Sequence, residues 1–199
     1  MKNFKFTKLN TLILALACLL LTSCGIQSIP RANNQVEAGW AEVVNQYKRR
    51  ADLIPNLVKT VKGYASHEKE TLEGVIKARA EATKTTINAD QLTPENIAKF
   101  QQAQTGLSGA LSKLMVVVER YPDLKASQNF RDLQVQLEGT ENRIAIARKR
   151  YIEIINRFNN LVTVVPTSWT NSIFFKFDKK AQFTVKNEAE VQQAPKVEF

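Results

Sequence analysis

The chain has 199 residues, and its 28 Lys and Arg against 19 Asp and Glu give a formal net charge of +9. This length is enough for one domain with a real core. The charges are interspersed and no aromatic-basic motif of a nucleic-acid-binding module is present, so we expect no nucleic-acid partner. Anionic lipid headgroups or cell-wall polymers are better counter-charges for an exported chain.

Residues 1–23 are typical of a secretory signal peptide. Lys2, Lys5 and Lys8 form a positive n-region, and residues 12–21 form a short apolar h-region. A transmembrane helix needs about 20 apolar residues, so this run is too short to span a bilayer unaided. An uncleaved anchor helix, with flanking residues extending the span, is the alternative.

The signal ends in Leu21-Thr22-Ser23-Cys24, which resembles the bacterial lipobox. The resemblance implies cleavage before Cys24 and acylation of its thiol, so the mature chain would hold no cysteine for a disulfide, a metal or nucleophilic catalysis. The mature net charge is about +6, because the removed segment holds three lysines and no acids. The next residue is glycine, not aspartate. In a bacterium with two membranes this favours the outer membrane, but the sequence does not give the number of membranes.

Residues 24–33 are predicted to form a lipidated tether, and residues 34–166 a helical body. Along the first helix apolar residues alternate at intervals of four and three, as in a heptad seam. These residues are Trp40, Val44, Tyr47, Ala51, Ile54, Val58, Val61 and Ala65. Pro55 is expected to kink this helix and Gly63 to end it.

A second helix is predicted over residues 66–85. Its expected inward residues are Leu72, Val75, Ile76 and Ala82. A single rod through both helices is the alternative. After a polar loop over 85–92, Thr93 and Pro94 predict an N-cap and first helical position.

The third helix is expected to end at Pro122, and Gly106 and Gly109 are positioned to admit a close neighbour. Its predicted inward residues are Ile97, Phe100, Gln104, Leu107, Leu111, Leu114, Val118 and Tyr121. A last helix of roughly 50 Å should run to Pro166. Its predicted seam is Phe130, Leu133, Leu137, Thr140, Ile144, Ala147, Tyr151, Ile154, Phe158, Leu161 and Val165. Such seams must be buried against one another, so the fold class is an all-α helical bundle.

Residues 167–180 form an aromatic and basic segment that contains Trp169, Phe174 and Phe177. It suits a membrane interface or an exposed interaction patch, and it could instead fold back over one end of the bundle. The polar tail 181–199 is predicted to be extended or disordered. Capture of the terminal carboxylate of Phe199, or strand addition by residues 183–185, would be its functional alternatives.

Four segments resemble the signature of the LemA family. They are NQYKRRADLIPNLV at 45–58, KGYASHEKETL at 62–72, VVVERYPDLK at 116–125 and QLEGTENRI at 136–144. The resemblance covers roughly residues 34–178 and implies an antiparallel up-and-down four-helix bundle displayed from a bacterial membrane. It implies no established enzymatic activity and transfers no catalytic residues. Family members are commonly held by a transmembrane helix, whereas this chain offers a lipobox.

The sequence gives little support for catalysis, a metal or a cofactor. His67 is the only histidine, and no paired-histidine motif or glycine-rich phosphate loop is present. Glu138 and Glu141 on the last helix could serve a cell-wall hydrolase. The other carboxylate grouping, Glu119 and Asp123, lies near the end of the third helix. Structural ion pairing is the alternative to hydrolysis, and for Glu138 and Glu141 the available arginines are Arg50, Arg143 and Arg148.

We therefore predict a lipid-anchored envelope protein that acts as a non-catalytic adaptor for an unidentified envelope partner. The candidate partner or membrane contacts are Arg49, Arg50, Trp169, Phe174 and Phe177. The two arginines could instead form the charged margin of the bundle. A cell-wall hydrolase and a membrane-surface modulator acting through residues 169–180 are the rival functions. The sequence does not give the oligomeric state.

Overall fold

A computed structural model describes the backbone of residues 2–183 and the side chains of residues 26–183. Residues 184–199, most of the predicted tail, lie outside it. The described backbone is helical and holds no strand, which confirms the all-α class. Its elements are α1 (Lys2–Tyr64), α2 (Lys69–Lys84), the 3₁₀ turn η1 (Ala89–Gln91), α3 (Pro94–Val118), α4 (Pro122–Ala126), α5 (Gln128–Thr163), α6 (Thr167–Thr170) and the π-helical turn η2 (Asn171–Phe175).

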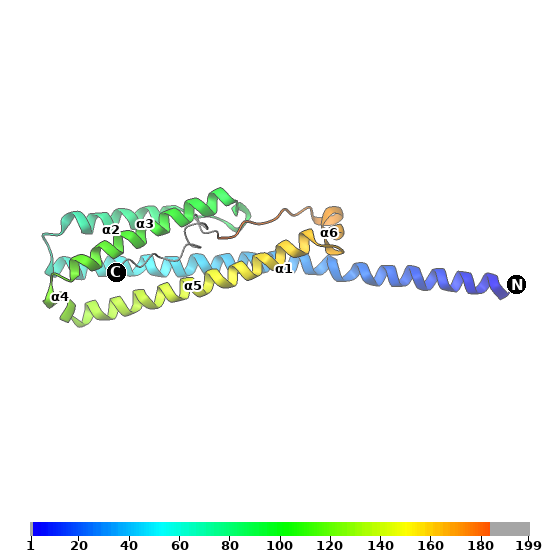
Figure 1. Cartoon of the computed structure of the whole chain (residues 1–199), viewed down its shortest axis with the longest axis horizontal. Helices are drawn as coiled ribbons and strands as arrows, with labels where there is room; N and C mark the ends of the chain where they lie inside the picture. Colours follow the sequence, from blue (N-terminus) through cyan, green and yellow to red (C-terminus); the bar gives the residue numbers. More distant parts are fainter. Residues whose placement is uncertain (1, 184–199) are drawn as a thin grey trace, which may run out of the picture.

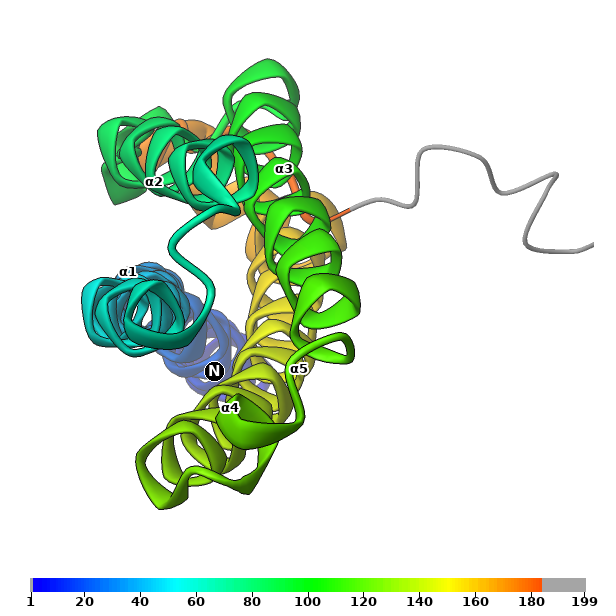
Figure 2. The ribbon, with the colours of Figure 1, turned by 90° about the vertical axis from the view of Figure 1, so that its left-hand side faces the viewer.

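Two helix pairs make up the body of the molecule (Figure 1). Helix α5 packs along α1, and α3 packs along α2 as a shorter hairpin that covers the half of the α1/α5 pair nearest α4. Seen from the α4 end, α2 and α3 lie over α1 and α5 (Figure 2). The two pairs approach each other most closely through α1 and α2, whereas the backbones of α3 and α5 approach each other little.

A turn at residues 65–68 separates α1 from α2, so the alternative of one continuous rod is wrong. Helix α1 continues through Pro55 and ends at Tyr64. Glu68 holds the turn against the corner before α4, because its Oε1 accepts hydrogen bonds from Arg120 at 2.9 Å and Tyr121 at 3.0 Å. These bonds join the residue that precedes α2 to the residues that follow α3, so the start and the end of this helix pair are held together.

The predicted tether at 24–33 is helical instead, as part of α1. Ile29 is fully buried and Ala32 is 4% exposed, and both belong to the same apolar cluster as Tyr151 and Phe158 on α5. The reason is that α5 is long enough to cover α1 beyond Trp40. The helix that would follow Cys24 therefore enters the core within a few residues.

The predicted seams are mostly buried, with a systematic departure in α5. There Ile155 and Val162 are buried, whereas Ile154 and Leu161 are half-buried and Val165 is exposed. A straight α-helix drifts by about 20° per heptad from a 3.5-residue repeat, so the contact line moves by one residue over five heptads. Ile76 on α2 was predicted to face inward, but it is exposed. On α1 the buried residue is Val43, whereas the predicted Val44 is half-buried.

The predicted close neighbour of Gly106 and Gly109 is absent from the described residues, since a Cβ added at either would have no atom within 4 Å. The close approach occurs at Gly39 instead. A Cβ there would lie 2.9 Å from Ile154 Cδ1 on α5. Glycine in α1, not in α3, is therefore where two helices come together.

The core is divided into two apolar clusters by a layer of buried polar residues. One cluster reaches from Ile29 to Tyr47 along α1, and the other from Ile54 to Ala65. Between them lie Arg50 on α1, Gln104 on α3 and Thr140 on α5, each 6% exposed or less. We call these three residues the polar layer. Such a layer can fix the register of packed helices, because a shifted helix leaves its polar groups unpaired.

The C-terminal segment returns along the bundle after α6 (Figure 1). Asn159 on α5 holds it through two bonds to the backbone of Lys180, at 2.9 and 3.0 Å. Phe183 is 7% exposed and lies edge-on to Tyr151 and tilted against Trp40. Of the two states predicted for the start of the tail, residues 181–183 are therefore extended and packed on the bundle, and not disordered.

Candidate functional site

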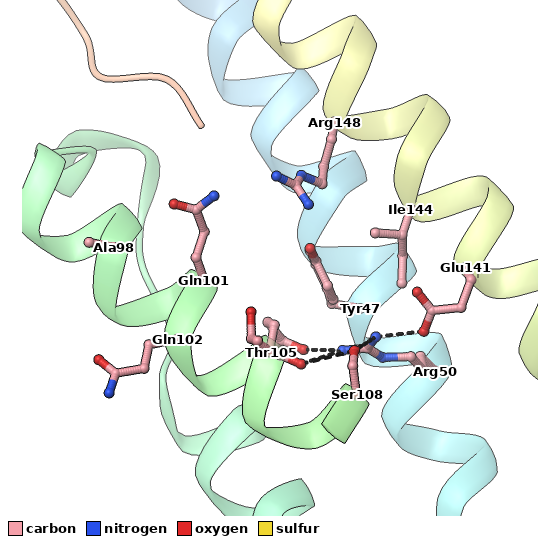
Figure 3. Close-up of a pocket in the computed structure, with 11 residues that line it drawn as sticks. Tyr47, Arg50, Ala98, Gln101, Gln102, Thr105, Ser108, Glu141, Ile144 and Arg148 are labelled. Carbon is pink, nitrogen blue, oxygen red and sulfur yellow. Dashed lines mark hydrogen bonds and ion pairs between the residues drawn. The ribbon is translucent and has the colours of Figure 1, made fainter. Parts of the chain in front are cut away.

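The strongest concentration of polar contacts surrounds Arg50, whose guanidinium joins three helices (Figure 3). Its Nη1 donates to Ser108 Oγ on α3 at 3.0 Å and to Glu141 Oε1 on α5 at 2.6 Å. Its Nη2 donates to Gln104 Oε1 at 2.7 Å. Gln104 in turn donates to the Ala82 carbonyl at 3.1 Å, which extends the network to α2. A single buried cation thus holds all four long helices in register.

A groove of about 460 Å³ opens between α3 and α5 above this network. Tyr47 and Arg50 of α1 line it together with Gln101, Gln102 and Thr105 of α3 and Glu141 and Arg148 of α5. In Figure 3 Tyr47, Thr105 and Glu141 lie around the space between the two helices. The lining offers amide, hydroxyl and guanidinium groups, which suit a polar polypeptide segment.

The upper wall of the groove is aromatic and basic. Burial raises the pKa of the Tyr47 phenol, against the opposing effect of Arg148 and Arg50, so this group stays a neutral donor at physiological pH. The Arg148 guanidinium lies 4.6 Å from the ring centroid of Phe183. Arg148 therefore both lines the groove and contacts the returning C-terminal segment.

The structure separates the predicted contact residues. Arg49 is exposed, but Arg50 is only 1% exposed and cannot serve as a surface contact. Trp169 and Phe174 are each 64% exposed. Phe177 is half-buried against Phe158 and stacks on Phe175, so it belongs to the core side of the segment. The corrections for Arg50 and Phe177 have one cause: side chains of neighbouring helices cover both residues, and the sequence alone does not show this.

The LemA family model matches residues 39–199. This chain belongs to the LemA family. It is 26% identical over 148 residues to Protein LemA of Metamycoplasma hominis, covering 74% of this chain and 63% of that protein. It is also 31% identical over 81 residues to the magnetosome proteins MamQ 1 and MamQ 2 of Paramagnetospirillum magneticum, covering 41% of this chain and 29% of each. The chain thus spans less than two thirds of the length of these relatives.

The carboxylates proposed for hydrolysis have separate structural partners in this LemA-family chain. Glu141 is bound by Arg50, and Glu138 accepts a hydrogen bond from Gln134 at 3.0 Å. Glu119 pairs with Lys125 at 2.6 Å. Residues 26–183 bring together no group of three metal-ligating side chains, and His67 is exposed in the turn after α1. The ion pair of Glu141 with Arg50 is the structural role that the sequence offered as the alternative to hydrolysis.

The lipobox residues lie in the backbone of α1, but their side chains are outside the described range. Across residues 26–183, no helix combines the length and the apolar content that crossing a membrane requires. The apolar run at 12–21 precedes that range. Acylation of Cys24 accordingly remains a prediction.

Sequence reasoning missed the role of Gln104 and Ser108 but held a signal for it. Gln104 occupies a seam position between the apolar seam residues Phe100 and Leu107, which is unusual unless the amide is hydrogen-bonded. Arg50 stands next to the seam residue Ala51. A polar residue on the seam of one helix and an arginine beside the seam of another could have been paired, but the choice of helix depends on the tertiary fold.

Proposed function

We propose that this LemA-family chain is a membrane-anchored envelope lipoprotein and a non-catalytic adaptor for an envelope protein. The partner would place an extended or helical segment with acidic side chains in the groove between α3 and α5. One observation carries this proposal. The groove displays Arg148 and a row of amide and hydroxyl groups, while Glu141 is neutralised by Arg50. An acidic side chain is the natural complement of such a lining.

Site-specific photocrosslinking tests the groove. A photoreactive residue at Gln102, which is exposed and lines the groove, should give one reproducible crosslinked envelope protein in intact cells. Lys113 is the matched control, because it is exposed on the same helix but lines the outer face toward α2. Arg148→Glu should reduce the Gln102 product by about tenfold, since it replaces attraction by repulsion. Equal products at both positions, or none at Gln102, would contradict the adaptor proposal.

The membrane anchor has its own test. Intact-mass analysis of the purified mature protein should show a chain that begins at Cys24 and carries acyl groups. Cys24→Ser should retain the full signal and leave the protein unacylated, because the thioether cannot form. A wild-type chain that keeps residues 1–23 would replace the lipid by an N-terminal helix as the anchor. Neither result depends on the groove.

A further inference from the structure

Exposed apolar side chains gather at the end of the bundle formed by α6. Within residues 26–183 eleven large apolar side chains are exposed. Five of them lie at 164–174, in and beside α6, and a sixth lies on α1, the helix against which α6 packs. These are Ile26, Val164, Val165, Trp169, Ile173 and Phe174, which we call the apolar tip. The remaining five are spread singly over the other helices, where they need no explanation. A concentrated patch indicates a contact surface.

Specific hydrogen bonds hold the backbone of the tip in one conformation. Asn171 is buried, its Oδ1 accepts from the Phe177 backbone N–H at 3.0 Å, and its Nδ2 donates to the Phe177 carbonyl at 2.9 Å. Lys176, in a left-handed conformation with φ 55°, closes the π-helical turn by donating to the Asn171 carbonyl at 2.7 Å. Phe175 and Phe177 turn into the core cluster. The same turn holds Ile173 and Phe174 outward, where they are exposed to solvent and do not contribute to the core.

The tip lies at the end of the bundle from which the N-terminal part of α1 projects. Helix α6 packs against both α1 and α5, and α1 continues past it toward the N-terminus (Figure 1). Ile29 is already in the core, and Cys24 precedes it by five residues, or about 8 Å of helix. A lipid on Cys24 and an apolar helix at 12–21 would therefore both put the membrane beside α6.

Basic residues lie on and just behind the tip. Residues 26–33 and 156–183 together contain five basic residues and one acid, Asp178. The basic residues are Arg31, Arg157, Lys176, Lys179 and Lys180. All but Lys180 are exposed. Each such residue near an anionic bilayer contributes about 1 kcal/mol of attraction. Aromatic residues at the boundary with cations behind them are the arrangement of membrane-interface anchors.

We propose that the apolar tip inserts into the headgroup region of the membrane that anchors the chain. Trp169, Ile173 and Phe174 enter the boundary between headgroups and acyl chains, and the basic residues contact anionic headgroups. This inference rests on the membrane anchorage proposed above and is independent of the groove. The bundle then stands upright, with its α4 end about 54 Å from the surface, which is the length of α5.

Tryptophan fluorescence tests the insertion, because the chain has two tryptophans in contrasting places. Trp40 is 2% exposed in the core, whereas Trp169 is 64% exposed in the tip. The full chain is reconstituted into anionic vesicles with brominated acyl chains, and co-flotation reports its anchorage. We expect quenching of the wild type and about fivefold less quenching of Trp169→Phe, because aromatic rings settle at the interface. Zwitterionic vesicles should give weaker quenching.

Val116→Trp in the Trp169→Phe background is the matched control. Val116 is 71% exposed and lies two residues before the end of α3, which α4 follows, so a tryptophan there should be quenched by aqueous acrylamide and not by brominated lipid. A co-floating wild type whose Trp169 is quenched only by acrylamide would overturn the insertion alone. Shielding of Trp169 from both quenchers would also overturn it, in favour of a covering protein or second copy. A chain that does not co-float would overturn the anchorage and the insertion together.

Discussion

Replacing Arg50 by methionine is expected to lower the free energy of unfolding by about 3 kcal/mol. Methionine fills much of the space but leaves Gln104 Oε1 and Ser108 Oγ without their donor inside the bundle. Glu141 contributes less to this loss, since its side chain is 51% exposed and water can solvate it. Urea unfolding followed by circular dichroism measures the change.

Arg50→Lys should lower the free energy of unfolding by less, about 1–2 kcal/mol, because an ammonium group retains the charge. Some loss remains, since the ammonium group cannot reach three helices at once. Glu141→Gln is the second control, with an expected loss of about 1 kcal/mol. The double variant Arg50→Met with Glu141→Leu should be less destabilised than the sum of its single changes. Additive losses would show that the two side chains do not interact, and would remove the ion pair from the account of helix register.

Replacing Phe183 by alanine is expected to destabilise the chain by about 3 kcal/mol. The ring lies 5.9 Å from Trp40 and 5.5 Å from Tyr151, measured between centroids, and Arg148 covers it. Its loss opens a cavity between α1 and α5. A shift in the midpoint of urea unfolding gives the value.

Phe174→Ala removes the same side chain from the exposed tip and serves as the control. It should change the free energy of unfolding by less than about 0.5 kcal/mol, because the ring is 64% exposed. If Phe183→Ala were equally neutral, the returning segment would not be part of the core. The polar tail would then leave the bundle at residue 181.

Phe183 is buried and Phe174 is exposed, and the sequence does not predict this difference. Both stand in polar or mixed surroundings without a helical period, so no local pattern separates them. One is buried by α1 and α5, which come from distant parts of the chain. The aromatic segment 169–177 divides in the same way, since Phe177 finds Phe158 and Trp169 finds no cover.

Local physics determined what the sequence predicted well. Thr93 caps α3 by accepting the Asn96 N–H at 3.2 Å, and Pro94 occupies its first turn, as the side chains alone require. The seam of α3 is buried almost residue for residue, because it is short enough for drift to stay small. The family signature was also present in the sequence, and the match over 39–199 confirms it.

Only the tertiary structure decided which polar and terminal residues are buried and which are exposed. The predicted tether is part of α1 because α5 covers it. Arg50 is not a surface contact because Gln104, Ser108 and Glu141 surround it. Helical period depends on neighbours three and four residues away, which the sequence displays directly. Burial of the Arg50 cation depends on residues 54 to 91 positions away, whose relative placement no local pattern records.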